Sequence, residues 1–371
     1  MCVSPLEQFR RHSVIGIAMK TSVLIALIAL LIIGCDRGLH SGHGDRITDI
    51  DFSPDGSKVV TCSVDKTVRI WNAATGVPLS TIDNPRPLLD LEVSPLGKTI
   101  ASVDTEGKIR LHDLDAGELV DEFSGDDLKE SYVEFSGDGK TIVSSSRLGG
   151  IRLWDADSGA LKKQIEESYR ATSRKGRILS PDGKWLISRT RSHLNLATYD
   201  ATTGELVLKL GGHAEDISDL VFSPDSKTVI TGCLNGVICI SDLTSGSVIN
   251  AINAHSGSIT DLSIDGTGEL LVSCSDDRSI KVWDIAKAEN LHTLQGHKHW
   301  VASAVFSPNG KMVASISVDK TVKIWDLASG KSMRTFTGHT EGIHQLAISP
   351  DGTRIATGGM DTFLGIWEVA E

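Results

Sequence analysis

The stretch that decides the fold is Gly296–Gly330, with the sequence GHKHWVASAVFSPNGKMVASISVDKTVKIWDLASG. It contains a Gly-His pair, an alternating apolar run, a Ser-Pro-Asn-Gly turn and a second alternating run. An Asp-containing turn and a third run, ending in Ile-Trp-Asp, follow. Proline presets φ and glycine accepts positive φ, so the turns have a physical cause. Because alternation with a period of two is typical of half-buried strands, the stretch predicts short strands joined by turns.

The spacing within this stretch recurs along the chain. His297 precedes Asp319 by 22 residues, Trp325 follows Asp319 by 6, and the same offsets return three more times. Positions equivalent to Trp71 follow at intervals of 41 to 45 residues, and they are His112, Trp154, Tyr199, Ser241, Trp283, Trp325 and Trp367. The chain therefore divides into eight units with no segment left over. A unit of this size cannot bury a core alone and must stack on its neighbours.

In its period and its Gly-His…Trp-Asp signature, the sequence resembles the WD-repeat β-propeller family. The resemblance covers residues 37–371 and implies an all-β fold, a single closed β-propeller of eight four-stranded blades, with seven blades as the alternative. The chain ends four residues after Trp367, too soon for another full strand. In this family the N-terminus supplies the missing outer strand of the last blade, and the candidate here is Arg37–Ser41.

The resemblance also gives a structural role to side chains that resemble a catalytic triad. In the family, a Ser or Thr four residues before the turn Asp joins the His, the Asp and the Trp in a hydrogen-bonded tetrad, which satisfies buried polar groups. A catalytic triad is needed once, whereas this set is complete in four repeats, so no catalytic residue is predicted. The predicted tetrads are His43, Thr61, Asp65 and Trp71; His255, Ser273, Asp277 and Trp283; His297, Ser315, Asp319 and Trp325; and His339, Thr357, Asp361 and Trp367.

Repeats 2–5 depart from the tetrad pattern. Repeats 6, 7, 8 and 1 are therefore expected to form a well-tied arc, a run of neighbouring blades with complete tetrads, and repeats 2–5 a weaker arc with fewer of these hydrogen bonds. The weaker arc is interpreted either as drift in tolerant blades or as a specialised surface. In this family, partners commonly bind the face that carries the Gly-His loops and the Asp turns. Trp and Arg are enriched at interaction hot spots. The candidate partner-binding residues there are Trp300, Arg46, Val64, Val318 and Met360, unless Trp300 only packs on its neighbour.

The N-terminal sequence resembles a targeting signal. Residues 23–33 are eleven consecutive apolar residues, too short to span a bilayer core of about 30 Å, which needs about 20 residues. They fit the apolar region of a secretory signal, and Lys20 precedes them. The following Gly34-Cys35 resembles the lipobox of bacterial lipoproteins, in which the cysteine is diacylated and becomes the mature N-terminus.

We therefore expect a signal peptide over 1–34, a lipidated Cys35 and a propeller over 36–371. Met19-Lys20 also reads as a natural start, which would make residues 1–18 an over-extended start. The alternatives for Cys35 are an uncleaved signal anchor and a chance cysteine.

Composition narrows the function. The formal charge of −11 argues against nucleic-acid binding. The six cysteines show neither a CxxC pair nor an even spacing, so neither a disulfide scaffold nor a metal site is expected. The sequence carries no P-loop, dinucleotide fingerprint, HExxH or nucleophile elbow, and no cofactor is expected.

The leading hypothesis is a non-catalytic protein-interaction scaffold, lipid-anchored at the bacterial envelope on the periplasmic side, with the inner or outer membrane left open. Its expected partners are proteins, identity unknown, and the membrane through the lipid anchor. One alternative is an envelope-assembly lipoprotein. A second is a propeller enzyme, which would require ligands converging on the inner strands around the central channel. The third is a cytosolic propeller with a misread signal.

Overall fold

The structure is a computed structural model that describes residues 38–124, 130–146, 150–165, 178–190 and 194–369. The expected signal peptide and Cys35 lie outside the described residues. Within the described ranges the regular elements are β-strands, and no helix is long and apolar enough to cross a membrane.

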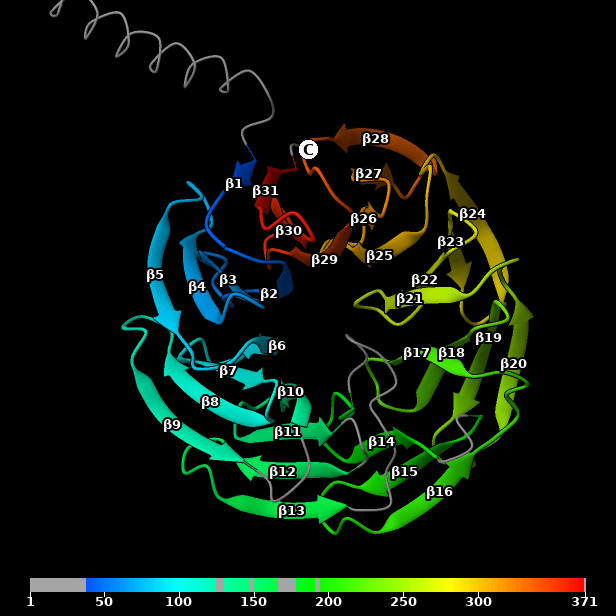
Figure 1. Cartoon of the computed structure of the whole chain (residues 1–371). Coiled ribbons are helices and arrows are strands. Elements are labelled where there is room, and N and C mark those ends of the chain that lie inside the picture. Colours follow the sequence, from blue (N-terminus) through cyan, green and yellow to red (C-terminus); the bar gives the residue numbers. More distant parts are fainter. Residues whose placement is uncertain (1–37, 125–129, 147–149, 166–177, 191–193, 370–371) are drawn as a thin grey trace, which may run out of the picture. The chain divides into compact units, whose positions relative to one another are not determined.

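Eight β-sheets surround a central axis (Figure 1). Seven sheets have four strands, and the remaining one has three strands plus an isolated antiparallel bridge between Leu179 and Leu186 at the place of its innermost strand. We number these sheets as blades 1 to 8 in chain order. The prediction of an eight-bladed all-β propeller is confirmed, and the seven-bladed alternative is wrong.

Strands follow each other from the centre outward in each blade. The innermost strands are β2 (Ile47–Phe52), β6 (Leu88–Val93), β10 (Glu130–Phe135), β17 (Ile217–Phe222), β21 (Ile259–Ile264), β25 (Val301–Phe306) and β29 (Ile343–Ile348). The second strands are β3 (Lys58–Ser63), β7 (Thr99–Asp104), β11 (Thr141–Ser146), β14 (Trp185–Arg189), β18 (Thr228–Cys233), β22 (Leu270–Ser275), β26 (Met312–Ser317) and β30 (Arg354–Gly359).

The third strands are β4 (Thr67–Asn72), β8 (Lys108–Asp113), β12 (Ile151–Asp155), β15 (Leu196–Asp200), β19 (Val237–Asp242), β23 (Ser279–Asp284), β27 (Val322–Asp326) and β31 (Leu364–Glu368). The outermost strands are β5 (Pro78–Asp83), β9 (Leu119–Ser124), β13 (Leu161–Ile165), β16 (Leu206–Leu210), β20 (Val248–Asn253), β24 (Glu289–Gln295), β28 (Lys331–Phe336) and, in blade 8, β1 (Leu39–His40).

The N-terminal strand closes the ring, as predicted. β1 pairs antiparallel with β31, Leu39 opposite Gly365 and His40 opposite Leu364. The Ile366 N–H also donates to the carbonyl of Gly38 at 2.6 Å. The closure leaves blade 8 without a missing outer strand and fixes the chain from Gly38 onward.

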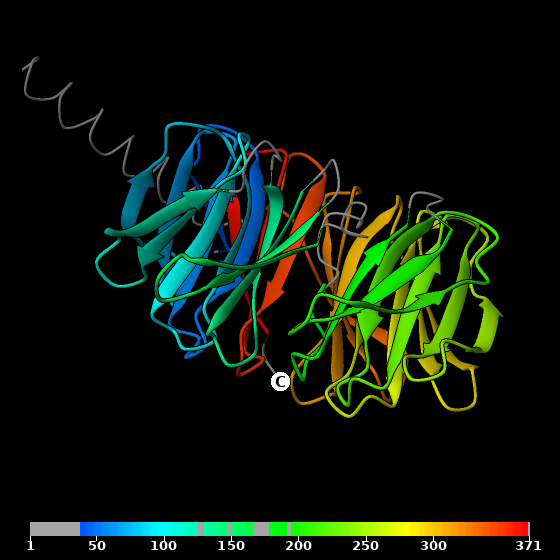
Figure 2. The ribbon, with the colours of Figure 1, turned by 90° about the horizontal axis from the view of Figure 1, so that it is seen from below.

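Because the strands are antiparallel, successive connections lie on opposite faces of the ring, and Figure 2 shows the blades edge-on. We call the face with the Gly-His loops and Asp turns the loop face, and the opposite one the turn face. On the turn face, Ser53 begins the first turn of blade 1. Its carbonyl accepts the N–H of Gly56 at 2.8 Å, and its hydroxyl donates to Asp55 at 2.6 Å. Gly56 has φ +69°, the left-handed region that glycine adopts without strain.

The hydrophobic core lies between neighbouring blades. The cluster that joins the two ends of the chain combines Ile47, Phe52 and Trp71 of blade 1 with Leu364 and Ile366 of blade 8. Each sheet therefore buries both of its faces, and a blade depends on its neighbours for stability.

Candidate protein-interaction surface

The hydrogen-bonded tetrad is a repeated feature of the loop face, and blade 7 illustrates it. His297 Nδ1–H donates to the carboxylate of Asp319 at 3.0 Å, and Nε2 lies 2.9 Å from the hydroxyl of Ser315. The same hydroxyl accepts the indole N–H of Trp325 at 2.8 Å. The Lys298 N–H donates to Asp319 at 2.7 Å. The network thereby ties the Gly-His loop, the second and third strands and the Asp turn together.

The structure brings together the predicted side chains in the other three blades in the same way. The distances from His Nδ1 to Asp, from His Nε2 to the hydroxyl and from the Trp N–H to the hydroxyl lie between 2.7 and 3.0 Å for His43, Thr61, Asp65 and Trp71, for His255, Ser273, Asp277 and Trp283, and for His339, Thr357, Asp361 and Trp367.

In the tetrads of blades 1 and 6 the electrostatics favour a neutral imidazole facing an ionised carboxylate. Burial lowers the pKa of His43, although the charge of Asp65 acts in the opposite direction. Burial would raise the pKa of Asp65, but hydrogen bonds from the Gly44 N–H, Thr67 and His43 outweigh it and lower that pKa to about 2. The hydroxyl of Thr61 then donates to His43 and accepts from Trp71. Since Thr61 is fully buried, its hydroxyl is a structural group and not an exposed nucleophile.

Three of the tetrads include a further hydroxyl that was not predicted. A hydroxyl two residues after the turn Asp donates to that carboxylate, at 2.7 Å for Thr67, 2.6 Å for Ser279 and 2.6 Å for Thr321. The same oxygen lies within 3.2 Å of His Nδ1 in each case. The repeated Asp-x-Thr or Asp-x-Ser pattern was the available signal. In blade 8 the position is Phe363, and His339 instead contacts both oxygens of Asp361.

The tetrads fix the residues predicted to bind a partner. A backbone hydrogen bond joins the Gly-His loop to the Asp turn in each blade, from Val318 N–H to the Trp300 carbonyl at 3.0 Å and from Val64 N–H to the Arg46 carbonyl at 3.2 Å. The equivalent bond in blade 8 runs from Met360 N–H to Gly342 at 3.2 Å. All five predicted residues therefore lie on the loop face of blades 7, 8 and 1, and we call them the 7–8–1 patch.

The 7–8–1 patch presents apolar groups to solvent. Trp300 is 53% exposed and Met360 is 50% exposed. Val64 and Val318 are half-buried, and Arg46 is exposed. Trp300 packs edge-on against the His299 ring at 5.4 Å, yet half of its surface remains free to contact a partner.

Contacts across the junction of blades 7 and 8 bring their parts of the 7–8–1 patch together. A Cβ added to Gly342 of blade 8 would lie 3.4 Å from the Val318 side chain of blade 7. Lys320 of blade 7 pairs with Glu341 of blade 8 at 3.9 Å. A larger side chain at position 342 would cover Val318, so the glycine keeps that part of the patch open.

In blade 2 the turn after the second strand is held by ion pairs and not by a tetrad. Buried Arg110 donates to Asp104 at 2.7 Å and to Glu122 at 2.6 Å. At the tetrad position, Asn84 Oδ1, Ser102 Oγ and His112 Nδ1 are buried and have no hydrogen-bond partner among the described residues. An ion-pair network therefore replaces the tetrad in this blade.

Blades 3 and 5 keep only parts of the tetrad. In blade 3 the Trp154 N–H donates to Ser144 at 2.8 Å. In blade 5 His213 Nε2 lies 2.9 Å from Thr231, and its Nδ1–H donates to the Leu194 carbonyl of blade 4 at 3.0 Å. A backbone carbonyl thus takes the place of the carboxylate.

Carboxylates do line the inner strands, but they bond to the next blade. Asp51 accepts the Val93 N–H at 2.9 Å, and Asp90 accepts the Val133 N–H at 2.9 Å. Glu134 accepts two N–H groups of blade 4, at 2.8 and 2.9 Å. Burial and the neighbouring charge of Asp49 hold the pKa of Asp90 well above its usual range.

These inner carboxylates are therefore used to join blades. Across the part of the chain that the structure describes, no group of three or more His, Cys, Asp or Glu side chains has an arrangement that would hold a metal ion.

Comparisons with known proteins agree with this architecture. The family described as WD domain, G-beta repeat matches residues 35–72, 118–155, 204–242, 246–284, 288–326 and 330–368. The matches cover more than half of the chain, which therefore belongs to the WD40 family. Repeats 2 and 4, which have lost most of the tetrad, fall between the matched segments. WD40 propellers are typical protein-interaction scaffolds that generally bind protein partners.

The curated relatives match only in part. Eukaryotic translation initiation factor 3 subunit I of Vanderwaltozyma polyspora is 25% identical over 210 residues, covering 55% of this chain and 51% of that protein. The same subunit of Emericella nidulans is 30% identical over 201 residues, with 52% and 49% coverage. U3 small nucleolar RNA-associated protein 21 of Saccharomyces cerevisiae is 36% identical over 66 residues, 18% of this chain and 7% of that protein. The chain thus spans about half the length of the initiation-factor relatives or less.

Among solved structures, the computationally designed Ika8 protein superimposes with a TM-score of 0.77 at 23% identity, covering 90% of this chain and 100% of that one. At this identity the likeness concerns the fold alone.

Proposed function

We propose that the protein is a non-catalytic interaction scaffold that docks a protein partner on the 7–8–1 patch. The observation that carries the proposal is Trp300, a large aromatic side chain held 53% exposed by a loop that the tetrad fixes. A rigid, exposed tryptophan loses little conformational entropy on binding, and Trp is enriched at hot spots. Met360 and Val318 extend the apolar contact, and Arg46 offers a charge at the edge of the patch.

We further propose that a lipid on Cys35 anchors the scaffold to the extracytoplasmic side of a bacterial membrane. This part rests on the apolar run at 23–33 and on Gly34-Cys35. The closing strand adds a geometric consequence, because β1 begins at Leu39, four residues after Cys35. Four extended residues span at most about 14 Å. An anchored propeller would therefore sit next to the headgroups, and a partner would meet it at the membrane surface.

The test is affinity purification of the full-length protein from gently solubilised membranes, with Trp300→Ala and Met333→Ala compared with the wild type. Met333 lies on the outer strand of the same blade, is 51% exposed and is not part of the patch, so it is the matched control. We expect a stoichiometric partner that is lost with Trp300→Ala and retained with Met333→Ala. A partner retained by both variants, or no partner from any correctly folded sample, would contradict the docking proposal.

The anchor has a separate test. Cells expressing the wild type or Cys35→Ala are labelled with a clickable palmitate analogue and fractionated. We expect label and membrane association in the wild type only. Unlabelled wild-type protein, or identical fractionation of the two proteins, would refute the anchor and leave the docking proposal untouched.

A further inference from the structure

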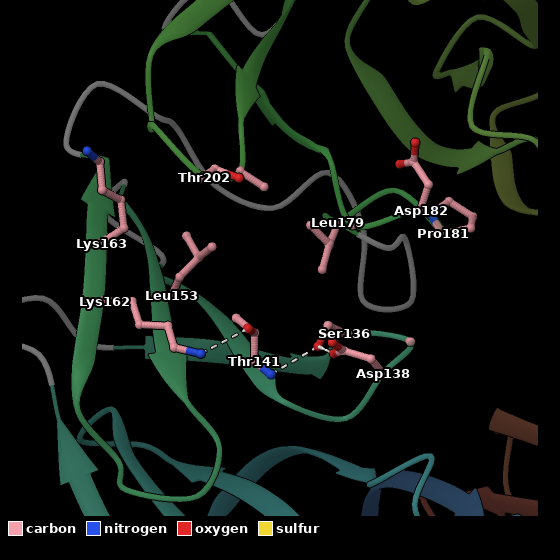
Figure 3. Close-up of a pocket in the computed structure, with 13 residues that line it drawn as sticks. Ser136, Asp138, Thr141, Leu153, Lys162, Lys163, Leu179, Pro181, Asp182 and Thr202 are labelled. Carbon is pink, nitrogen blue, oxygen red and sulfur yellow. Dashed lines mark hydrogen bonds between the residues drawn. The ribbon is translucent and has the colours of Figure 1, made fainter.

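A cavity of about 470 Å³ opens between blades 3 and 4, lined by residues of the turn face (Figure 3). This volume lies within the roughly 300–1,000 Å³ typical of ligand sites. Blade 3 contributes the turn at Ser136 and Asp138 and the side chain of Leu153. Blade 4 contributes Leu179 and the turn at Pro181. The cavity is thus separate from the 7–8–1 patch in both blade and face.

The sequence explains why the cavity exists. At the junction of blades 1 and 2 the proline of one turn lies beside the glycine of the next, and a Cβ on Gly97 would lie 3.7 Å from Pro54. The corresponding distances to a preceding proline are 3.0 Å at Gly268 and 3.2 Å at Gly352. Blade 3 has Gly137 in place of that proline, and a Cβ on Gly183 of blade 4 would meet nothing within 4 Å. The missing proline ring leaves the junction open.

The inner part of the cavity is apolar. Leu153, Leu179 and Ala201 line it and belong to the core cluster between blades 3 and 4. The two leucines face each other across the cavity in Figure 3. A ligand that enters therefore needs an apolar segment to fill the space beside these side chains.

The two lysines at the wall do not offer a free cation to a ligand. Lys162 donates to the Lys140 carbonyl at 3.1 Å and to Thr141 at 3.3 Å, and pairs with Asp155 at 3.0 Å, which uses its three N–H groups. Lys163 points its ammonium group away from Leu153 and Leu179 in Figure 3, and its stem lies against Gly204. A carboxylate or phosphate ligand would find no aligned donor there.

Two carboxylates, Asp138 and Asp182, also line the cavity, and Lys184 pairs with Asp182 at 3.2 Å, which leaves Asp138 as the candidate for a ligand. Asp138 accepts the Ser136 hydroxyl at 2.6 Å and the Lys140 N–H at 3.0 Å, and both bonds fall on Oδ1. These bonds lower the pKa of Asp138, so the carboxylate is ionised at neutral pH. Its second oxygen remains available at the mouth for a cation.

We propose that this cavity binds a guanidinium or ammonium group on an apolar stem, with the stem between Leu153 and Leu179 and the charged head on Asp138. Such a group is either a basic side chain of a partner protein or a free alkyl amine. Either source gives the chain a second binding site, and the proposal does not depend on the 7–8–1 patch or on the lipid anchor.

The experiment titrates the full chain by calorimetry with two cationic probes, agmatine and a Gly-Leu-Arg-Gly peptide with blocked ends, and with the anion glutarate as the control of opposite charge. Gly137→Pro restores the turn sequence found at Ser180-Pro181-Asp182-Gly183 and fills the opening. Gly266→Pro is the matched control, because blade 6 also has glycine in place of the proline. Asp138→Asn removes the charge alone, since Asn309 makes the same turn bonds in blade 7, at 2.7 and 3.0 Å.

We expect at least one probe to bind the wild type and Gly266→Pro alike, binding to be lost in Gly137→Pro, and Asp138→Asn to weaken it at least ten-fold. Binding of the peptide alone identifies a partner side chain as the source, whereas binding of agmatine supports a free amine. Absence of binding by both probes, or unchanged binding in Gly137→Pro or Asp138→Asn, overturns the proposal. Stronger binding of glutarate than of agmatine overturns it as well.

Discussion

Removing the imidazole of His297 tests whether the tetrads hold the loop face. His297→Ala deletes the bond to Asp319 at 3.0 Å and the contact with the Ser315 hydroxyl at 2.9 Å. Asp319 keeps the Lys298 N–H at 2.7 Å and the Thr321 hydroxyl at 2.6 Å, so its charge stays solvated by the protein. The main loss is at the fully buried Ser315 hydroxyl, whose remaining acceptor, the Lys323 carbonyl, lies 3.5 Å away. Leaving such a group unpaired costs about 1–3 kcal/mol, which is the expected loss in free energy of unfolding.

The assay is urea unfolding of the full chain at pH 7, with His213→Ala as the matched variant. His213 contacts Thr231 at 2.9 Å but donates to a backbone carbonyl, Leu194 O, at 3.0 Å. Hydrogen bonds to charged groups are stronger than neutral ones, so His213→Ala is expected to cost less. Hydrogen exchange of the Val318 amide, which bonds to Trp300, should accelerate in His297→Ala only. Equal losses of stability in the two variants would refute the distinction between a well-tied and a weaker arc.

Three further predictions follow from the closure and the carboxylates. Leu39→Asp puts a charge on the closing strand beside the blade 8 core and should lower the free energy of unfolding by about 1–3 kcal/mol. Ser41 is exposed, so the control Ser41→Asp should change that free energy little. Urea unfolding of both variants measures the difference. Asp90 has a pKa raised by burial and by Asp49, so its stabilising contribution is present below the unfolded value of about 3.9 and is lost as pH rises through the folded value. Asp90→Asn mimics the protonated form and should flatten the decline of stability as pH rises above about 4; parallel curves would contradict this. The folded pKa of Asp65 is about 2, so its stabilising contribution is present above about pH 4 and is lost as pH falls toward 2. Asp65→Asn should therefore make the acid unfolding curve shallower in that window. An unchanged curve would count against the pKa argument.

The sequence was sufficient for the number of blades and for the closure because both depend on a period. The interval of about 42 residues between Trp71 and its equivalents defines each unit, and the N-terminal segment before the first unit is the β1 that pairs with β31. The tetrad positions follow from the same offsets, and the five side chains of the 7–8–1 patch follow from the tetrads. Cys35 and the expected signal peptide lie outside the described residues, so the localisation stays a prediction.

Features that depend on contacts between blades were not predicted. Asp49 and Asp51 alternate with apolar residues along their strand, and this pattern predicts side chains that face solvent. Each carboxylate instead accepts a backbone N–H of the next blade about 40 residues later, and no local pattern specifies that pairing. The cavity has a similar origin, because Gly137 is visible as a departure from Ser-Pro-Asp-Gly, but its consequence appears only when the next turn is placed beside it.

The two devices that hold the ring are distributed independently, since blades 1 and 6 carry both a complete tetrad and an inner carboxylate bonded to the next blade. Blades 7 and 8 have complete tetrads, and the position of Asp49 on their innermost strands is taken by the uncharged Ser303 and Gln345. Blades 2 and 3 have incomplete tetrads, but Asp90 and Glu134 bond to the backbone of the next blade. A tetrad rigidifies loops within one blade, whereas an inner carboxylate ties neighbouring blades and leaves the loop-face side chains free to vary. Loss of the tetrad in blades 2 and 3 is therefore compatible with a stable ring, which accounts for a fold that tolerates weak repeats beside the tetrad-bearing blades of the 7–8–1 patch.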